Sequence, residues 1–500
     1  MKKCNFILVL IFMAMGLHPV FCQWNPLGKP INGRIALEKL GSSVSLSADG
    51  YTLAVGAPGD KTVATTAGSC KAYRQQGGSW VLITPEITGE KIGDRFGHSV
   101  SLSSDGNTLA IGAPNLEGVK TKKGYVKIFQ VISGVWVQLG NTIFSREGGD
   151  LFGYSVSLSS DGTIVAIGAP YNDVNSRKFD GGIVRVYRLR NLVWTQVGTD
   201  IQCKSAADRF GTSVSLAGNG QSLVIGAPWN DANGSNSGQV TAFQWNGGNW
   251  EQMGQDIYGD AVEDWFGWSV AISKDGHTLV AGAFKNDAGG SNAGHARVYQ
   301  FRNNSWIQAG QDIHGEGPGD QFGYSVSINA MGNIVAIGGP LNAGTGLHEG
   351  HVKVLKIRNG AWTLIDSELF GRNAGDWYGS AVALNDAGNI VAGGASENAS
   401  GGQVLVFENK KLLATEPVSP SPQISGIYPN PTSEQVYLRL DNNPPATLSI
   451  TNTSGAELLT KSLPGNAGTL RLDIGTFAPG LYVITIQTPT ERIHRLIQKI

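Results

Sequence analysis

The sequence predicts an all-β protein, and three observations support this fold class. Short runs rich in Val, Ile, Leu and Ser are bounded by Gly, Asp and Asn, which is the pattern of strands joined by tight turns. Helix-favouring runs are scarce. Glycine makes up 69 of the 500 residues without a three-residue period, so a collagen-like chain is excluded. This length also indicates several domains or a repeat array.

The N-terminus has the layout of a secretory signal peptide. Lys2 and Lys3 precede an apolar run from Phe6 to about Leu17, which is too short to span a bilayer. We therefore expect residues 1–22 to be removed, and no later segment is apolar enough to cross a membrane. The chain carries 38 Lys and Arg against 39 Asp and Glu, so nothing in its charge favours nucleic acid as a partner.

One segment, "FGYSVSLSSDGTIVAIGAP" at 152–170, recurs in seven similar copies. The copies are spaced by 56 residues, with one spacing of 58, and a tryptophan stands 16 residues before each of them. A period of this length with four short strands per unit indicates a propeller or a solenoid. The residues before the first glycine of each copy are Leu40, Phe96, Phe152, Phe210, Phe266, Phe322 and Tyr378.

The second copy shows the strands of one unit. We expect strands at 99–103, 108–114, 125–130 and 136–140, with Asp105-Gly106 as the first hairpin turn. Small residues alternate with large ones because both faces of a blade are buried against neighbouring blades. The four strands form one blade.

The two ends of the repeat array complement each other. The seventh copy supplies strands at 381–385, 389–395 and 403–408 and then lacks the tryptophan strand, whereas an unpaired "WNPLG" stands at 24–28. The sequence therefore predicts a seven-bladed β-propeller over 23–409, closed by the N-terminal strand. Closure removes the exposed strand edges that a solenoid would have to cap.

The motif resembles a known repeat family. Phe-Gly opening one strand and Gly-Ala-Pro closing the next resemble the FG-GAP repeat of integrin alpha-chain propellers, over about 24–409. In that family a calcium loop of the type Asp-x-Asp-x-Asp-Gly often joins these strands. Here the hairpins are "SADG", "SSDG", "SSDG", "AGNG", "SKDG", "NAMG" and "NDAG", which lack the spaced carboxylates that calcium requires. We expect no metal and no cofactor.

The C-terminal region differs in composition from the repeats. Residues 410–423 include a Pro/Ser-rich linker, and 424–500 read as a small β-sandwich of about seven strands. Tyr-Pro-Asn-Pro at 428–431, Pro-Gly-Leu-Tyr at 479–482 and a basic last strand resemble the type A sorting domain of the type IX secretion system. The resemblance implies a Bacteroidota-type bacterium, export to the cell surface or medium, and the secretion machinery as partner of 424–500. A terminal sandwich used for binding is the alternative.

The sequence offers no catalytic residue. "GYSVS" lacks the last glycine of a serine-nucleophile elbow and recurs along the chain, and no zinc or phosphate motif is present. Cys70 and Cys203 lie in different repeats, so we expect separate thiols. His348 and His351 are expected to be a solvated loop pair. The repeated carboxylates two residues before the motif aromatic are expected to cap backbone N–H groups; they are Asp94, Asp150, Asp208, Asp264, Asp320 and Asp376.

The positions that flank the motif vary from blade to blade, and strand direction places them all at one end of the propeller. Aromatic residues gather there in the third to fifth blades, with Tyr324 beside them, where they could stack on sugars, anchor a protein partner, or pack between blades. We therefore predict a surface or secreted binding or adhesion module. A secreted polysaccharide hydrolase or lyase is the alternative, and a spacer without a ligand is a third possibility. The candidate ligand-binding residues are Tyr154, Tyr171, Trp229, Trp265, Trp268 and Tyr324.

Overall fold

The computed structural model describes residues 24–115, 122–175, 179–344, 347–413, 423–428, 431–441, 446–463, 469–487 and 492–500. The expected signal peptide and most of the expected linker lie outside these ranges. The chain divides into two compact units, Met1–Leu413 and Ala414–Ile500, and each is described by itself. Among the described residues, helices long and apolar enough to cross a membrane are absent.

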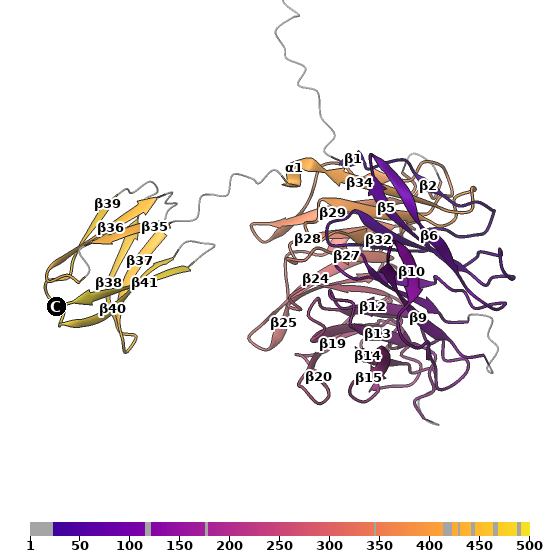
Figure 1. Cartoon of the computed structure of the whole chain (residues 1–500), viewed down its shortest axis with the longest axis horizontal. Coiled ribbons are helices and arrows are strands. Elements are labelled where there is room, and N and C mark those ends of the chain that lie inside the picture. Colours follow the sequence, from indigo (N-terminus) through magenta and orange to yellow (C-terminus); the bar gives the residue numbers. More distant parts are fainter. Residues whose placement is uncertain are drawn as a thin grey trace, which may run out of the picture. The chain divides into compact units, whose positions relative to one another are not determined.

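The first unit is a ring of seven antiparallel sheets, and each sheet is one blade of a β-propeller (Figure 1). Four strands follow one another from the axis outward, as the sequence predicts. The innermost strands are β3 (Ser43–Leu46), β7 (Ser99–Leu102), β12 (Ser155–Leu158), β17 (Ser213–Leu216), β22 (Ser269–Ile272), β27 (Ser325–Ile328) and β32 (Tyr378–Leu384). The second strands are β4 (Thr52–Ala57), β8 (Thr108–Ala113), β13 (Ile164–Ala169), β18 (Ser222–Ala227), β23 (Thr278–Ala283), β28 (Ile334–Gly339) and β33 (Ile390–Ala395).

The outer half of each blade holds a third strand, an outermost strand and, in six blades, an additional strand of two residues. The third strands are β5 (Ser69–Gln76), β9 (Tyr125–Ile132), β14 (Ile183–Arg190), β19 (Gln239–Trp245), β24 (His295–Arg302), β29 (His351–Arg358) and β34 (Gln403–Asn409). The outermost strands are β6 (Ser79–Thr88), β10 (Val135–Gln138), β15 (Val193–Gln196), β20 (Trp250–Gln252), β25 (Ser305–Gln308), β30 (Ala361–Leu364) and β1 (Trp24–Pro26). The short strands, which the sequence did not predict, pair with the third strand of their blade and are β11 (Ile143–Phe144), β16 (Ile201–Gln202), β21 (Ile257–Tyr258), β26 (Ile313–His314), β31 (Leu369–Phe370) and β2 (Ile31–Asn32).

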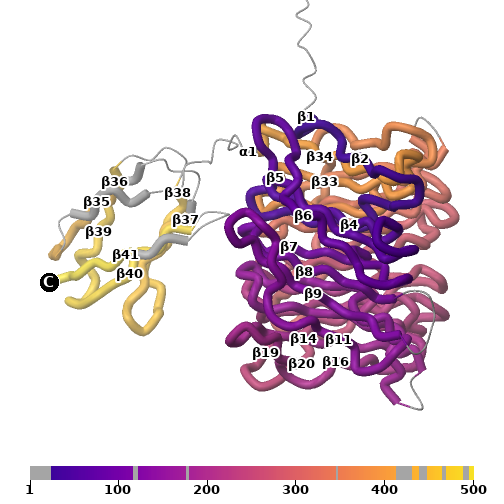
Figure 2. Tube along the Cα trace, turned by 45° about the vertical axis from the view of Figure 1, so that its right-hand side comes forward, coloured from indigo at the N-terminus to yellow at the C-terminus, as the bar shows by residue number. Residues whose placement is uncertain are grey.

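The N-terminal strand completes the last blade. Strand β1 pairs antiparallel with β34, with Trp24 opposite Asn409, and β2 pairs with the same strand. In Figure 2 the indigo β1 accordingly lies beside the orange β34. The side chain of Trp24 is 2% exposed, and its indole Nε1 donates a hydrogen bond of 2.9 Å to the carbonyl of Ile365 in the preceding blade. The innermost strands β3 and β32 are also in contact, so the ring is closed.

A second closure surrounds the axis at the hairpin end, where the first and second strands of each blade are joined. One backbone N–H from each hairpin donates to a carbonyl of the next blade, with N···O distances between 2.8 and 3.2 Å. The side chain of Lys274 reaches across this end, with Nζ 2.6 Å from Asp386 Oδ2 and 3.2 Å from Ser104 Oγ. The residues of this cyclic chain of hydrogen bonds are, in order, Ala48, Ser104, Ser160, Gly218, Lys274, Ala330 and Asp386.

Contact between blades explains why the same residues recur in each copy of the motif. Phe96 is fully buried, and Gly97 follows it with φ +85°, which favours glycine. A Cβ atom on Gly112 would lie 2.1 Å from the carbonyl oxygen of Gly153 in the next blade. That carbonyl also accepts a hydrogen bond of 2.9 Å from Ser99 Oγ. The repeated motif therefore specifies how closely blades pack, and its chemistry is structural.

The described residues of the second unit form seven strands in two sheets, as predicted for a small β-sandwich. Leu448, Ile450 and Ile484 are fully buried in its core. Thr432, which follows the Tyr-Pro-Asn-Pro segment, forms a parallel bridge with Lys499 in the last strand. The sheets are β35 (Gln423–Tyr428), β36 (Gln435–Asp441) and β39 (Thr469–Asp473), and β38 (Glu457–Leu463), β37 (Ala446–Asn452), β40 (Gly480–Gln487) and β41 (Arg492–Lys499).

A short helix ends the propeller unit. Helix α1 (Lys410–Leu413) follows β34 directly, and Leu412 packs against the core of the last blade. The propeller unit therefore extends slightly past residue 409, where the composition places its end.

Candidate ligand-binding site

Two sets of loops meet at the end of the propeller opposite the hairpins. One set leads from an outermost strand to the next blade, and the other joins the second strand to the third. Asp376 ties them together, because its Oδ1 accepts a hydrogen bond of 2.7 Å from Asn398 Nδ2 while its Oδ2 accepts one of 2.9 Å from the N–H of Asn373. The expected capping role is thus confirmed: Asp94, Asp208, Asp264 and Asp320 cap N–H groups in the same way, and Asp150 accepts from the N–H of Phe152 instead.

In every blade the residue before the motif aromatic has a left-handed backbone, with φ between 55° and 58°. This conformation costs roughly 1 kcal/mol for a residue with a Cβ atom, yet none of the seven is glycine. Retention of a side chain at a strained position is a reason to seek a function for it. The seven residues are Lys39, Arg95, Leu151, Arg209, Trp265, Gln321 and Trp377.

Four of the candidate aromatic residues form a continuous row of rings. The ring centroids lie 5.6 Å apart for Trp229 and Trp265, 5.7 Å for Trp265 and Trp268, and 5.6 Å for Trp268 and Tyr324. Phe284 packs beneath three of them, 5.0 Å from Trp268 and 5.3 Å from Tyr324. Sequence reasoning missed Phe284, although its signal was present: the motif there reads Gly-Ala-Phe instead of Gly-Ala-Pro.

Tyr171 joins this row through an arginine. The guanidinium carbon of Arg209 lies 3.3 Å from the ring centroid of Tyr171 and 4.5 Å from that of Trp229. Such stacking is favourable because the ring faces carry negative charge density. Arg209 Nη2 also lies 3.2 Å from Asp180 Oδ2, so its charge is balanced.

Tyr154 contacts the ring of a histidine. Its ring centroid lies 4.6 Å from that of His98 in the preceding blade. Burial, aided by the nearby charge of Arg95, lowers the pKa of His98 to about 4, so this imidazole is neutral at neutral pH. Burial likewise raises the pKa of the Tyr154 hydroxyl, which stays protonated.

A cavity of about 420 Å³ opens on the axis among these loops, and we call it the axial cavity. Its wall includes Tyr154, Trp268 and Tyr324, whereas Tyr171, Trp229 and Trp265 lie beside it and form what we call the aromatic rim. Tyr171 is 37% exposed and the three tryptophans are half-buried, so their rings are accessible in part. All seven residues that follow the motif glycine line the axial cavity: Ser42, His98, Tyr154, Thr212, Trp268, Tyr324 and Ser380.

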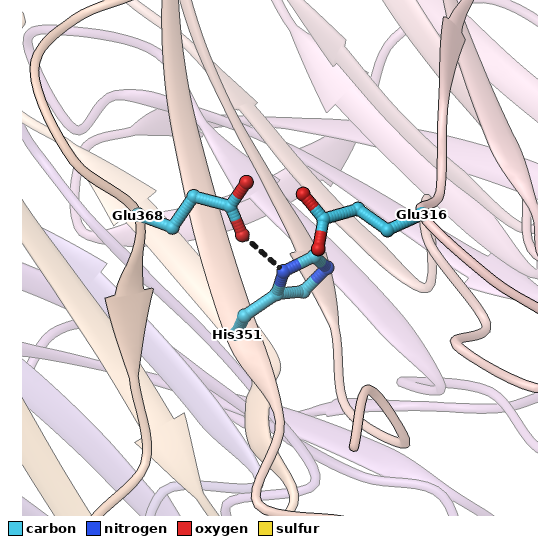
Figure 3. A group of neighbouring side chains, drawn as sticks. All are labelled: Glu316, His351 and Glu368. Atoms are coloured by element: carbon cyan, nitrogen blue, oxygen red, sulfur yellow. Dashed lines mark hydrogen bonds and ion pairs between the residues drawn. The ribbon is translucent and has the colours of Figure 1, made fainter. Parts of the chain in front are cut away.

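The predicted histidine pair is not a loop pair. His348 is exposed, but His351 begins β29, is fully buried, and its Nδ1 lies 2.8 Å from Glu368 Oε2 (Figure 3). Glu316 completes a group with the composition of a metal site. Lys353 Nζ, however, lies 3.0 Å from Glu316 and 3.2 Å from Glu368, and its ammonium already supplies positive charge to both carboxylates.

A lysine between carboxylates also occurs in the first blade, although without a histidine, which favours a structural role for both groups. There Lys71 is paired with the buried Glu38 and lies 3.5 Å from Glu86. The expectation that no metal is bound stays a prediction. Cys70 and Cys203 are buried in different blade interfaces, as expected for separate thiols.

Comparison with known proteins agrees with the two units. Residues 204–243 and 259–299 match the model of the FG-GAP repeat, and residues 426–499 match that of the secretion system C-terminal sorting domain. No curated protein matches the chain. Among solved structures, the Dos1 propeller is similar at 13% identity with a TM-score of 0.45, over 77% of this chain and 95% of that one. The β-propeller domain of the Trilobed protease from Pyrococcus furiosus is similar at 11% identity with a TM-score of 0.43, over 74% and 95%. These likenesses carry no inference about function.

Proposed function

Because the chain carries FG-GAP repeats and a C-terminal sorting domain of the type IX secretion system, which directs it to the cell surface or extracellular space, we propose that its propeller is a carbohydrate-binding module. The ligand site is the axial cavity together with the aromatic rim. One observation carries the proposal: partly exposed aromatic rings from the third to sixth blades gather beside one cavity.

The distribution of variation along the repeat supports this site. The buried aromatic, the glycines and the blade-linking serines recur because blade packing requires them. The residues around the axial cavity differ from blade to blade, so packing alone does not dictate them. Flat rings such as Trp268 suit the C–H faces of sugars, and a concave, partly apolar pocket with a few polar groups is typical of small-ligand sites.

The charges of the axial cavity favour binding over hydrolysis. Most glycoside hydrolases use two carboxyl groups that flank the bond to be cleaved. Of the described residues lining the axial cavity, Glu397 alone carries a carboxylate, and its Oε1 lies 2.9 Å from Lys39 Nζ. We therefore rank the polysaccharide-active enzyme below the binding module.

The proposal predicts that changing Trp229→Ala and Trp268→Ala together strongly weakens glycan binding. Loss of two central aromatic contacts should weaken affinity by about 30-fold or more, because one such contact is often worth about 2 kcal/mol. The measurement is a glycan array with the mature chain, residues 23–500, followed by calorimetry on the best ligand. Both indoles are half-buried, with Trp229 in the aromatic rim and Trp268 in the wall of the axial cavity, so we expect the melting temperature to change little.

The matched control changes two aromatic residues at the hairpin end. Tyr51→Ala with Trp245→Ala should leave binding intact, since Tyr51 and Trp245 lie far from the axial cavity along their strands. Unchanged binding by the Trp229 and Trp268 variant would refute the site. If the same site captured a protein instead of a glycan, the ligand would be a protein. If reducing sugars were released, the propeller would be an enzyme and not only a binding module.

A further inference from the structure

Resting on the proposed function, we propose that the axial cavity binds a hexuronate, a sugar that bears a carboxylate, and that Arg95 is the residue that binds this carboxylate. The inference names the ligand class of the same site. It depends on the pairing of the charged groups in the wall of the axial cavity.

Arg95 is half-buried and, unlike the buried arginines of the propeller, has no carboxylate partner among the described residues. Its Nε is buried without a hydrogen-bond acceptor, and its guanidinium makes no ion pair with the described residues. In contrast, Arg185 lies 2.9 Å from Asp200, and Arg209 and Arg297 also have carboxylate partners. A half-buried guanidinium with free N–H groups favours a planar, bidentate acceptor, and a carboxylate is the best match.

The rest of the axial cavity leaves the charge of Arg95 uncompensated. Lys39 and Glu397 neutralise each other across 2.9 Å, and His98 is neutral at neutral pH. Trp268 and the other lining residues carry no charge, so the wall of the axial cavity has a net charge of +1 from Arg95. An anionic ligand is therefore favoured over a neutral one of the same shape.

Two hydroxyl groups of the wall, those of Ser42 and Thr212, are arranged to accept hydrogen bonds. Ser42 Oγ donates to the carbonyl of Lys39 at 2.8 Å, and Thr212 Oγ1 donates to that of Arg209 at 2.7 Å. Their protons are thus engaged, and their oxygen lone pairs are available to hydroxyl donors. A sugar supplies such donors in addition to an apolar ring face for Trp268, which a simple carboxylic acid does not.

The test compares oligogalacturonate with its fully methyl-esterified form, using calorimetry on the mature chain. The two probes have the same ring and length, and only the first is charged. We expect the acid to bind at least 10-fold more tightly. Arg95→Gln should weaken binding of the acid by roughly 10- to 100-fold, as expected for a lost charge-assisted contact. It should leave the affinity for the ester unchanged. Arg302→Gln, at an exposed position of an outer strand, is the matched control and should change neither.

Several results would overturn this inference. They are equal affinity for acid and ester, no effect of Arg95→Gln, equal binding of dextran sulfate, and absence of binding to both oligogalacturonate and alginate oligomers. If a neutral glycan binds to the parent protein but not to the variant with Trp229→Ala and Trp268→Ala, the proposed function stands and only the hexuronate assignment fails. If no glycan depends on those tryptophans, both fail.

Discussion

Removing residues 24–32 from the chain of residues 23–500 should open the closed ring of the propeller. The deletion takes away β1 and β2, so β34 loses both pairing partners on one side and becomes an exposed edge. It also removes Trp24, whose buried side chain alone is worth about 3–5 kcal/mol, a large part of a typical domain stability of about 5–15 kcal/mol. We expect aggregation or a strongly lowered melting temperature, measured by light scattering and calorimetry.

A peptide control separates loss of closure from general damage. Adding a synthetic peptide of residues 24–32 should restore part of the lost stability, and the same peptide with Trp24→Ala should not, because the indole contact with Ile365 is then missing. A truncated chain that remains monomeric and melts like the parent would show that the seventh blade does not need its N-terminal strand.

Removing residues 424–500 should stop the protein from reaching the cell surface or the medium. The sorting-domain match covers 426–499, and these residues form a compact unit with a core of their own. We expect the truncated chain to accumulate in the periplasm of a host with type IX secretion, as a folded propeller that resists limited proteolysis. Cell fractionation and immunoblotting give the readout.

The full chain with Trp229→Ala and Trp268→Ala serves as the export control, because its sorting unit is intact and it should be exported at the level of the parent. Truncated protein in the medium at parental levels would contradict the assignment of the sorting function to this unit.

The blades could be predicted from sequence because the turn residues, the strand lengths and the two ends of the repeat array all indicate the same fold. Asp105-Gly106 marks a hairpin, the strands have the right length, and the missing tryptophan strand of the last copy is present at Trp24. The short fifth strands were missed because a pair such as Ile143–Phe144 is too brief to show alternation. His351 was misplaced because nearness in sequence to His348 does not reveal that a strand begins between them and turns the second imidazole inward.

The sequence could predict at which end of the propeller the candidate site lies, but not which of its side chains are in contact. Alternating strand directions fix which loops share an end, so Tyr154 and Trp229 could be assigned to it from sequence. Which rings touch depends on side-chain rotamers and on neighbours that vary, such as Phe284 under the row and Arg209 between two rings. The strained backbone at Arg95 and its equivalents has no signal in the residue types themselves.

The most direct measurement of the ligand face is hydroxyl-radical footprinting of the mature chain with and without the array glycan that binds best. The site described here predicts that the glycan protects Trp229, Trp265 and Trp268 from oxidation. Tyr51 and Trp245 at the hairpin end should react equally with and without it. Protection confined to the hairpin end or the outer strands, with the three tryptophans oxidised as in the free protein, would contradict the central claim that this propeller binds its ligand at the axial cavity and the aromatic rim.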